Sequence, residues 1–216
     1  MESYSQYGQD KFIYENFFKT LARPGVFVDV GAYDGITCSN TLMFERHFGW
    51  KGICIDPHPG AFAKMKKFRT AICVNCAVSD APGKAKFLDV KMPNAWAMFS
   101  GLKENYDEKH RQLIDTLGKI TAEIEVEVRR LPDILDENNI RHIDYMTIDT
   151  EGSEWKILQG FDFTKYDVSV LSIENNYHDM NIRKHMVDNG YQLTNIFGGI
   201  DDLYIKSKLD RATARP

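Results

Sequence analysis

A glycine-rich stretch near the start of the chain, VDVGAYDG at residues 28–35, has the composition of a ligand-binding loop. An apolar run stops at Asp29, and Gly31, Asp34 and Gly35 follow within six positions. Glycine lets the backbone come close to a ligand, and open α/β sheets bind ligands at the carboxyl ends of their strands. A tight turn that binds nothing is the alternative interpretation.

The spacing of the loop narrows the class of ligand. A dinucleotide fingerprint has the pattern GxGxxG, whereas three residues separate Gly31 from Gly35, and no GK[ST] follows as a P-loop requires. Asp29 and Asp34 would repel a pyrophosphate, but they would attract the sulfonium and ammonium groups of S-adenosylmethionine (SAM). The loop therefore favours SAM over a dinucleotide or a nucleoside triphosphate.

A second acidic position supports a nucleoside ligand. Asp56 ends the apolar run 52–56 and lies 21 residues after Gly35. A carboxylate at this place can accept both hydroxyls of an adenosine ribose. NAD enzymes share the feature, so it indicates a nucleoside rather than SAM alone, and an Asp that caps a helix before Pro57 is the alternative.

Further polar residues follow two later apolar runs. Asp149 and Glu151 come after the run 143–148, and Glu174 and Asn175 come at the end of 168–174, with His178 close behind. The carboxyl ends of neighbouring parallel strands share one edge of a sheet, so we expect these side chains beside the glycine loop. Carboxylates at a dry strand end are costly unless they bind a cation, a donor or a substrate hydroxyl.

The order of elements predicts an α/β fold with a mainly parallel central sheet and helices on both of its faces. Short β-branched or apolar runs alternate with helical patterns in the first third of the chain and again after residue 140. The predicted core strands are 26–30, 52–56, 71–78, 143–149 and 168–174. Two further strands, 191–197 and 201–206, form a C-terminal antiparallel hairpin across GGI, which distinguishes SAM methyltransferase sheets from most dinucleotide sheets.

The chain reads as one domain of residues 1–216, with three subsidiary parts. These are an N-terminal helix region (1–24), an inserted segment (84–130) that is a possible substrate wall, and a frayed tail (207–216). The insert is predicted to contain strands 83–90 and 123–128 and a helix at 102–117. Its loop 91–101 carries Trp96, Met98 and Phe99, which suit a lid, a substrate wall or plain core packing.

Composition excludes some classes of function. The net charge is −4 and basic residues are scattered among acids, so no nucleic-acid partner is expected, and the basic cluster 64–69 is interpreted as the exposed face of a helix. No apolar run of about 18 residues predicts a membrane span, and the N-terminus lacks a signal-peptide pattern, so we expect a cytoplasmic protein. Cys73 and Cys76 form a lone CxxC without further ligands, which favours buried thiols over zinc or redox chemistry.

These residues resemble the FkbM-type SAM-dependent methyltransferases. The resemblance runs in the family's order over nearly the whole chain, through SQYGQDKFI, FVDVGAYDGITCSNT, GWKGICIDPHP, NCAVSD, IDYMTIDTEGSEWKILQGFDF and LSIENN. One departure is Asp56, where the family usually has Glu. The resemblance implies a Rossmann-like class I methyltransferase fold and methyl transfer, mostly to a hydroxyl of a sugar or polyketide.

The resemblance also implies where SAM binds. Residues of the glycine loop would line its methionine part: Asp29, Gly31, Ala32, Asp34 and Gly35. Ser39 and Asn40 would meet its carboxylate, and Asp56 would hold the ribose. Residues 75–78, with Asn75 and Ala77, would border the adenine. The N-terminal YGQD would close over the cofactor with two of its side chains, Gln9 and Asp10.

Methyl transfer to a hydroxyl needs alignment and removal of a proton, for which two arrangements remain open. In the first, Asp149, Glu151 or His178 is the general base. In the second, Asp149, Glu174 and Asn175 bind Mg²⁺ or a similar cation, a set similar to that of catechol-type methyltransferases, and the ion lowers the pKa of the hydroxyl. Across the two arrangements, the predicted catalytic residues are Asp149, Glu151, Glu174 and His178.

Three functions are compatible with these residues. The first is a SAM-dependent O-methyltransferase that acts on a sugar or glycan, either by itself or as one domain of a larger glycan-modifying protein. The second is methylation of a non-sugar small molecule or of nitrogen, although the [DN]PP[FY] motif of many amino methyltransferases is missing. The third is a non-catalytic binding domain, against which the acidic residues at 29, 56, 149 and 174 argue.

Overall fold

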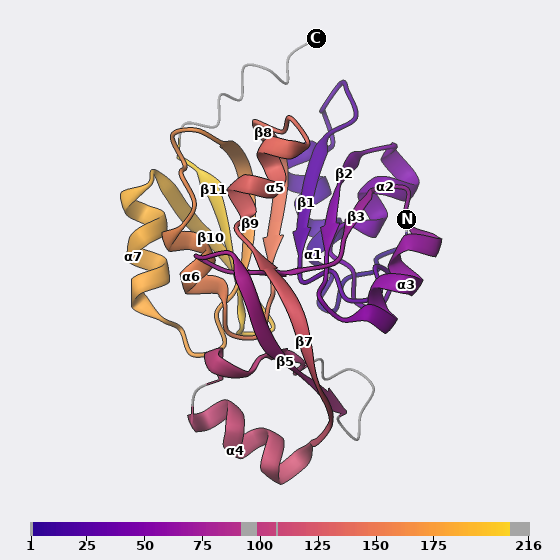
Figure 1. Ribbon diagram of the computed structural model, residues 1–216. Helices are drawn as coiled ribbons and strands as arrows, with labels where there is room; N and C mark the ends of the chain where they lie inside the picture. Colours follow the sequence, from indigo (N-terminus) through magenta and orange to yellow (C-terminus); the bar gives the residue numbers. More distant parts are fainter. Residues whose placement is uncertain (1, 92–98, 107, 208–216) are drawn as a thin grey trace.

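The computed structural model of the protein describes residues 2–91, 99–106 and 108–207. Its centre is a seven-stranded sheet, drawn in Figure 1. The strands of this sheet are β1 (Val26–Val30), β2 (Lys51–Ile55), β3 (Ile72–Val74), β8 (His142–Ile148), β9 (Asp167–Glu174), β10 (Tyr191–Phe197) and β11 (Asp201–Lys206). Their order across the sheet is β10-β11-β9-β8-β1-β2-β3.

Strand direction confirms the predicted sheet. β1 pairs in parallel with β2 and with β8, β8 with β9, and β2 with β3. β11 runs antiparallel to both β9 and β10, which forms the predicted C-terminal hairpin. The carboxyl ends of β1, β2, β8 and β9 therefore meet at one edge of the sheet, and we call this edge the carboxyl edge.

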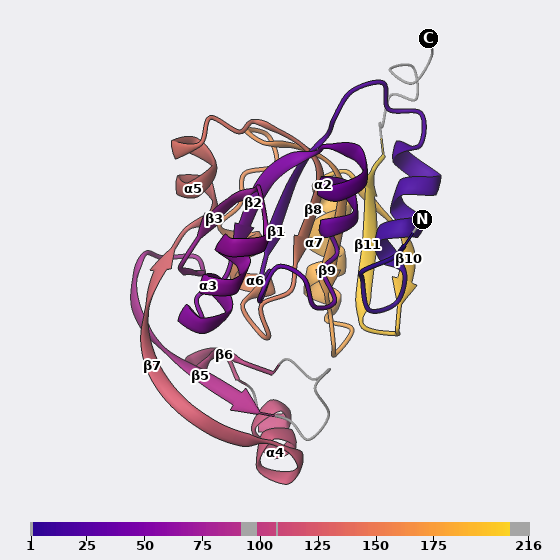
Figure 2. The same ribbon diagram turned by 90° about the vertical axis from the view of Figure 1, so that its right-hand side faces the viewer.

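Helices cover both faces of the central sheet (Figure 2). Successive residues of a strand point to opposite faces, so Phe27 of β1 packs in one apolar cluster and Val28 in another. The cluster of Phe27 includes residues of α1 (Gln9–Ile13), the following π-helix (Tyr14–Phe18), α2 (Leu42–Phe48) and α3 (Pro59–Phe68). The cluster of Val28 includes residues of α5 (Leu131–Glu137), α6 (Glu154–Gln159) and α7 (Met180–Asp188).

The inserted segment forms a second sheet of four strands. These are β4 (Ala77–Val78), β5 (Gly83–Lys91), β6 (Gly101–Leu102) and β7 (Lys119–Arg129), in the order β4-β7-β5-β6. A 3-10 turn (Lys103–Asn105) and α4 (Glu108–Leu117) follow β6. In Figure 1, β5 and β7 extend away from the central sheet, and α4 lies at their far end.

Two sequence predictions need correction here. The predicted strand 71–78 is two strands, because the chain leaves the central sheet after Val74 and joins the second sheet at Ala77. The side chain of Asn75 between them donates to the carbonyl of Asp56 (2.8 Å), which holds the crossing at the end of β2. The predicted helix 102–117 begins only at Glu108, because the 3-10 turn precedes it.

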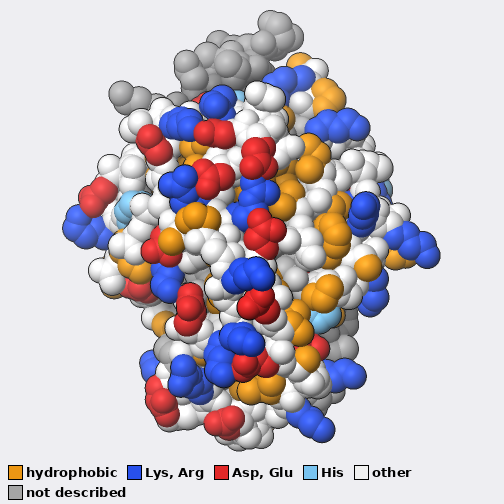
Figure 3. All heavy atoms as spheres, in the orientation of Figure 1, with side chains coloured by type: hydrophobic (Ala, Val, Ile, Leu, Met, Phe, Trp, Pro, Cys, Tyr) orange, Lys and Arg blue, Asp and Glu red, His pale blue; other side chains and the backbone are white. Residues whose placement is uncertain are grey.

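The remaining expectations concern the loop 91–101, the C-terminal tail, the cysteines, membrane spans and the surface charge. Trp96, Met98 and the tail 208–216 lie outside the described residues, whereas Phe99 packs beside Leu88 and Val90. All four cysteines are free, and two of them are buried. None of the described helices has the length and apolar character needed to cross a membrane. Acidic and basic side chains are intermixed on the face shown in Figure 3.

Candidate active site

The glycine loop crosses the carboxyl edge directly after β1. The backbone N–H groups of Gly31 and Ala32 both donate to the carbonyl of Ile55 at the end of β2 (3.0 Å each). Gly31 has φ +88°, and a Cβ on it would lie 1.6 Å from the carbonyl oxygen of Asp149. Only glycine fits this position, because a side chain would collide with the backbone that follows β8.

The two aspartates of the loop stabilise it from within. Asp34 accepts hydrogen bonds from the N–H groups of Ile36 and Thr37 (3.0 and 2.8 Å). Asp29 is buried and accepts from the hydroxyl of Thr41 (2.5 Å), and burial raises its pKa. Asp34 thus holds the loop's own turn and Asp29 fastens the loop to the start of the next helix, and neither is among the residues that line the larger cavity described below.

A buried arginine holds this loop together, and the sequence analysis missed it. Arg69 donates to the carbonyl of Gly35 (3.0 Å), to Ser39 Oγ (3.2 Å) and to Glu45 (2.9 Å). Its guanidinium also lies 4.0 Å from Asp29. Arg69 was predicted on the exposed face of a helix within 64–69, which is wrong for this residue, although the neighbouring lysines are exposed.

Ser39 and Asn40 both lie just before α2. Ser39 Oγ accepts from the N–H of Leu42 (3.1 Å) and so caps the helix. The Asn40 amide donates to Thr147 Oγ1 of β8 (3.2 Å). Its Oδ1 is buried and has no hydrogen-bond partner among the described residues. A buried acceptor without a partner is a place where a ligand donor, such as an ammonium group, fits.

Asp56 lies at the end of β2 and faces a large cavity. Its carboxylate accepts from the N–H groups of Tyr33 (2.9 Å) and His58 (2.8 Å). Burial raises its pKa to about 7. The Asp56 side chain therefore changes between its charged and neutral forms near neutral pH.

The cavity has a volume of about 690 Å³, which is in the size range of sites for small ligands and cofactors. It lies between the carboxyl edge and the second sheet. Gly31, Asp56, Ala77, Asp149 and Glu151 are the predicted site residues that line it. The second sheet contributes the opposite wall, with Phe87, Asp89, Val90, Ser100, Leu102 and Thr121.

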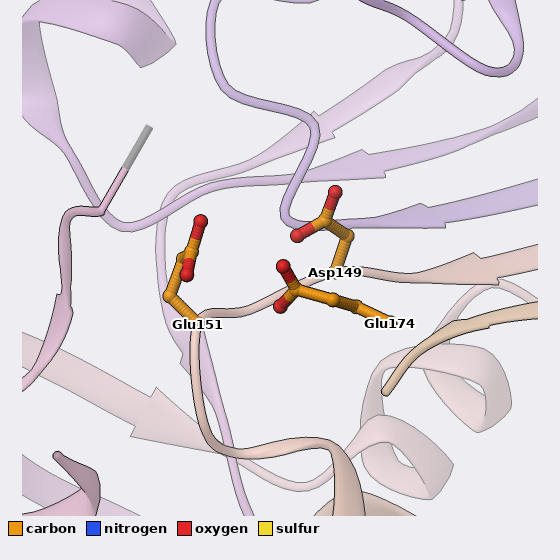
Figure 4. Close-up of side chains that lie close together, drawn as sticks. All are labelled: Asp149, Glu151 and Glu174. Atoms are coloured by element: carbon orange, nitrogen blue, oxygen red, sulfur yellow. The ribbon is translucent and has the colours of Figure 1, made fainter. Parts of the chain in front are cut away.

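Three carboxylates meet beside this cavity (Figure 4), and two of them, Asp149 and Glu151, line it. Asp149 and Glu151 follow β8, Glu174 ends β9, and one oxygen of each lies within 4.8 Å of the others. Burial raises the pKa of all three, and mutual repulsion adds to the effect, since Asp149 acts on both Glu151 and Glu174. We call these three residues the carboxylate cluster. Groups of like charge this close need a shared proton or a cation.

Asn175 and His178, which were predicted beside these carboxylates, have other partners. The Asn175 amide donates to Asp202 (2.9 Å), and its Oδ1 accepts from the N–H of Asp179 (2.6 Å). His178 Nδ1 lies 3.2 Å from the guanidinium of Arg183. The carboxylate cluster thus contains Glu151 in the place where the sequence analysis put Asn175.

The N-terminal residues Gln9 and Asp10 are buried. Gln9 Nε2 donates to Asp201 (2.7 Å), which neighbours Glu174 across the β9–β11 pair. Asp10 accepts from Ser3, from the N–H of Tyr4 and from Ser5. Both side chains fasten the N-terminal segment, and neither lines the cavity.

Three cavity residues were missed by the sequence analysis: Tyr33, His58 and Asp89. Tyr33 lies inside the glycine loop, where only small and acidic residues were weighed, and its φ of +50° is unusual for a residue with a side chain. His58 Nε2 lies 3.6 Å from Asp89 Oδ2 and so connects α3 to the second sheet. The position of Tyr33 in the loop was a usable signal, whereas the His58–Asp89 contact was not readable from sequence.

Comparison with known proteins identifies the family. The family model described as "Methyltransferase FkbM domain" matches residues 29–193. The 31-O-demethyl-FK506 methyltransferase FkbM of Streptomyces tacrolimicus is 30% identical in an alignment of 188 residues that covers 71% of this chain and 69% of that protein.

Two solved structures share the fold. Methyltransferase FkbM from Methylobacillus flagellatus KT superimposes with a TM-score of 0.53 and 15% identity over 91% of this chain, which spans 50% of that structure. The METTL16 methyltransferase domain gives a TM-score of 0.52 and 10% identity over 92% of this chain and 65% of the other. The central sheet with its antiparallel β11 is thus the sheet of class I SAM methyltransferases, and the chain belongs to the FkbM methyltransferase family.

Proposed function

We propose that this protein is a SAM-dependent O-methyltransferase that acts on a hydroxyl of a sugar or glycan, with another small molecule such as a polyketide as the alternative acceptor. One observation carries the proposal: the cavity lined by Gly31 and Asp56 is also lined by Asp149 and Glu151 of the carboxylate cluster. A space suited to a nucleoside therefore adjoins groups that accept protons. The printed name of the Streptomyces relative, a methyltransferase of a 31-O-demethyl compound, also favours oxygen as the methyl acceptor.

The residues of the carboxyl edge fit SAM. Asp56 would accept from the ribose hydroxyls, and Ala77 would border the adenine beside the crossing held by Asn75. Gly31 lines the same cavity and would border the methionine part, while its missing side chain makes room for the Asp149 carbonyl. The unpartnered Oδ1 of Asn40 is an acceptor, so it suits the ammonium group of SAM better than the carboxylate that the family resemblance implied.

SAM supplies a methyl group on a positively charged sulfur, which is already a good leaving group. The protein has to align an acceptor oxygen with that methyl group and remove its proton. We assign the proton to the carboxylate cluster, since burial raises the pKa values of Asp149, Glu151 and Glu174 and makes them stronger bases than exposed carboxylates. His178 is a weaker candidate because its ring lies beside the cation of Arg183.

The same three carboxylates fit a divalent cation. Hard oxygen ligands within 4.8 Å of one another suit Mg²⁺, and Glu151 replaces Asn175 in the set that the sequence analysis proposed. A bound ion would lower the pKa of the acceptor hydroxyl and offset the repulsion within the cluster. Chelation separates the two arrangements, because only the second requires a metal for turnover.

We assign the acceptor to the space beneath the second sheet. The wall of the cavity on this side mixes apolar Phe87, Val90 and Leu102 with polar Asp89 and Thr121. Such a surface suits a molecule with both apolar faces and hydroxyl groups. The insert 84–130 would then be the substrate wall of a single methyltransferase domain. This domain is compatible with a place in a larger glycan-modifying protein.

The test is calorimetric titration with SAM and with S-adenosylhomocysteine, each in Mg²⁺ and in EDTA. We expect micromolar binding of either ligand by the folded protein. Acceptor screening with deoxy-sugars, glycans and polyketides would follow, with transfer of a labelled methyl group as the readout. Absence of binding by folded protein would refute the proposal, and turnover that survives EDTA would assign proton removal to the carboxylates alone.

A further inference from the structure

A second, smaller cavity adjoins the carboxylate cluster. Its volume is about 150 Å³, and it is lined by Glu174, whereas Asp149 and Glu151 line the larger cavity. One oxygen of each of these carboxylates lies within 4.8 Å of the others, so the carboxylate cluster borders both cavities. A group bound in the smaller cavity would therefore lie next to the residues to which we assign proton removal.

The loop after β8 is a wall that the two cavities share. Residues 149–151 and 153 line the larger cavity, and residues 152, 154 and 155 line the smaller one. Gly152 has φ +117°, and a Cβ on it would lie 3.0 Å from the carbonyl oxygen of Asn105 in the 3-10 turn. The Asn105 amide also donates to Ser153 Oγ (2.6 Å). The insert is thus fastened to this loop, which gives the smaller cavity a defined wall on that side.

Two polar residues of the smaller cavity are occupied within the protein. Glu154 accepts from the N–H groups of Thr150 (2.7 Å) and Gly152 (3.0 Å), and Asn175 has the partners described above. No Lys or Arg is among the described residues that line this cavity, and several of them are acidic. An anionic ligand is therefore disfavoured.

Three other lining residues keep polar atoms that make no hydrogen bond within the described part of the chain: Asn176 Oδ1, Asp179 Oδ2 and Trp155 Nε1. The remaining polar atoms of two of them are used. Asn176 Nδ2 donates to Glu174 (2.8 Å), and Asp179 Oδ1 accepts from an N–H in the first turn of α7 (2.8 Å). The cavity thus offers two acceptors and one donor, a set that matches hydroxyl groups, which both donate and accept.

Two aromatic side chains complete the lining of the smaller cavity. The indole of Trp155 packs edge to face on His185, with ring centroids 5.5 Å apart. The ring of Tyr177 is 44% exposed, and Lys109 Nζ of α4 lies 5.2 Å from its centroid. A small ring with hydroxyl groups on its edge and C–H groups on its faces suits such a lining. The volume is below the range of about 300–1,000 Å³ typical of drug-sized ligands, so the cavity has room for one such ring.

We propose that the smaller cavity is a subsite for a neutral, polyhydroxylated ring of the methyl acceptor, such as one sugar unit. The acceptor is then a glycan or glycoside of at least two units. One unit occupies this subsite, another lies beneath the second sheet, and the hydroxyl to be methylated lies at the carboxylate cluster. The inference rests on the proposed function, because it assigns the bound ring to the acceptor of methyl transfer.

The test follows the indole N–H signal of Trp155 by heteronuclear NMR in the presence of S-adenosylhomocysteine. The probes are the methyl glycosides of glucose, mannose, galactose, rhamnose and fucose, with 1,4-diaminobutane as a cationic comparison. The chain has three Trp residues, and Trp155→Phe identifies the signal. We expect at least one glycoside to shift this signal with a Kd on the order of 1–10 mM, the scale for a ligand of this size.

Matched variants locate the bound glycoside. Tyr177→Ala should weaken its binding about fivefold, the scale of one aromatic contact, and leave the affinity for S-adenosylhomocysteine unchanged. Phe68→Ala is the control, because Phe68 is also exposed and has Lys67 Nζ 5.4 Å from its ring centroid, but it lines neither cavity. Tyr177→Leu replaces Tyr177→Ala if the latter fails to fold, since Leu keeps apolar bulk without an aromatic face.

The outcomes separate this inference from the proposed function. If S-adenosylhomocysteine binds but no glycoside shifts the Trp155 signal, the subsite is refuted and the proposed function stands. Unchanged glycoside binding in Tyr177→Ala, or equal weakening in Phe68→Ala, would also refute the subsite. Tighter binding of 1,4-diaminobutane than of every glycoside would overturn the assignment to a neutral ring. Protein that binds a glycoside but neither SAM nor S-adenosylhomocysteine would refute the proposed function and, with it, the acceptor role of the cavity.

Discussion

The central sheet and the second sheet are stabilised in different ways. Strands β1, β2 and β8 are buried on both faces between two layers of helices. The second sheet has only small apolar clusters, and one of its faces carries exposed ion pairs such as Lys84–Glu125 (2.7 Å) and Lys103–Glu123 (2.6 Å). Exposed pairs contribute little to stability, so the second sheet depends on the central one.

This difference in burial indicates which part of the molecule holds its functional groups in fixed positions. The groups that we assign to SAM and to proton removal lie on the carboxyl edge of the buried sheet, whose backbone has little freedom. In the proposed function the second sheet only shapes the acceptor space, so we expect it to tolerate change on its exposed face. Four predictions test this difference between the two sheets, and they are given in order of decreasing effect.

The largest contrast is between two glycines. Gly31→Ala should destabilise the protein by more than about 3 kcal/mol, because the new Cβ would collide with the carbonyl of Asp149 at a positive φ. Gly83→Ala on β5 has nothing within 4 Å of its Cβ and should stay within about 0.5 kcal/mol of wild type. Urea denaturation measures both, and equal losses would contradict the contrast.

The second contrast concerns catalysis. Asp149→Asn should lower turnover at least about 100-fold, because it removes a proton-accepting or metal-binding carboxylate, while S-adenosylhomocysteine affinity stays within about threefold. The matched variant Glu123→Gln changes a carboxylate that pairs with Lys103 on the second sheet and should keep wild-type turnover. Methyl transfer to an acceptor found by screening is the readout. Full activity of Asp149→Asn would remove this residue from the mechanism.

The third contrast compares two acids that line the same cavity from opposite walls. Asp56→Ala should weaken SAM binding by about 1–3 kcal/mol, the value of hydrogen bonds to a charged group. Asp89→Ala should change SAM affinity by less than about 0.5 kcal/mol and instead raise the KM of the acceptor. Calorimetry and steady-state kinetics distinguish these effects. Equal loss of SAM affinity in both variants would mean that the second sheet also holds the cofactor.

The smallest contrast depends on pH. His142, at the amino edge of the central sheet, bonds to Asp144 (3.1 Å) and then to Asp167 (2.8 Å), and these bonds raise its pKa. Its contribution is therefore complete below about pH 6.5 and is lost as the pH rises through the raised pKa of the folded state. The ring is 41% exposed, so solvent limits the change to less than about 1 kcal/mol.

Denaturation at pH 5.5 and pH 8.5 measures this change in wild type and in His142→Asn. The variant should show a smaller loss of stability between the two pH values. Glu125→Gln is the control on the second sheet, because the pKa of Glu125 is lowered by Lys84 and that of Lys84 is raised, so the pair keeps its charges over this interval. An identical pH dependence in wild type and His142→Asn would contradict the prediction.

Much of the fold was predictable because its signals are local. Most core strands are short apolar runs that end in glycine, proline or an acid, and the order of such runs determines a parallel sheet. The break between Val74 and Ala77 was not predictable, since residues 71–78 have a continuous strand pattern. Only the partners differ, and these are β2 for the first half and β7 for the second.

The residues of the site likewise include some that were predictable from the sequence and others that were not. Gly31, Asp56 and Asp149 could be chosen from the sequence because strand ends share one edge. The exchange of Asn175 for Glu151 in the carboxylate cluster could not, because it depends on Asp202 of β11, which draws the Asn175 amide away from the cavity. The burial of Arg69 likewise depends on contacts with residues 24 to 40 positions earlier in the chain.

The insert enters and leaves the core at adjacent positions. Ala77 of β4 is paired in register with Val128 of β7, and Val78 with Arg129. The stretch from 79 to 127 therefore starts and finishes on neighbouring strands, so its replacement need not move either point. A segment of different length could therefore replace residues 79–127. Such a replacement would alter the proposed acceptor side of the cavity and leave the residues of the carboxyl edge unchanged.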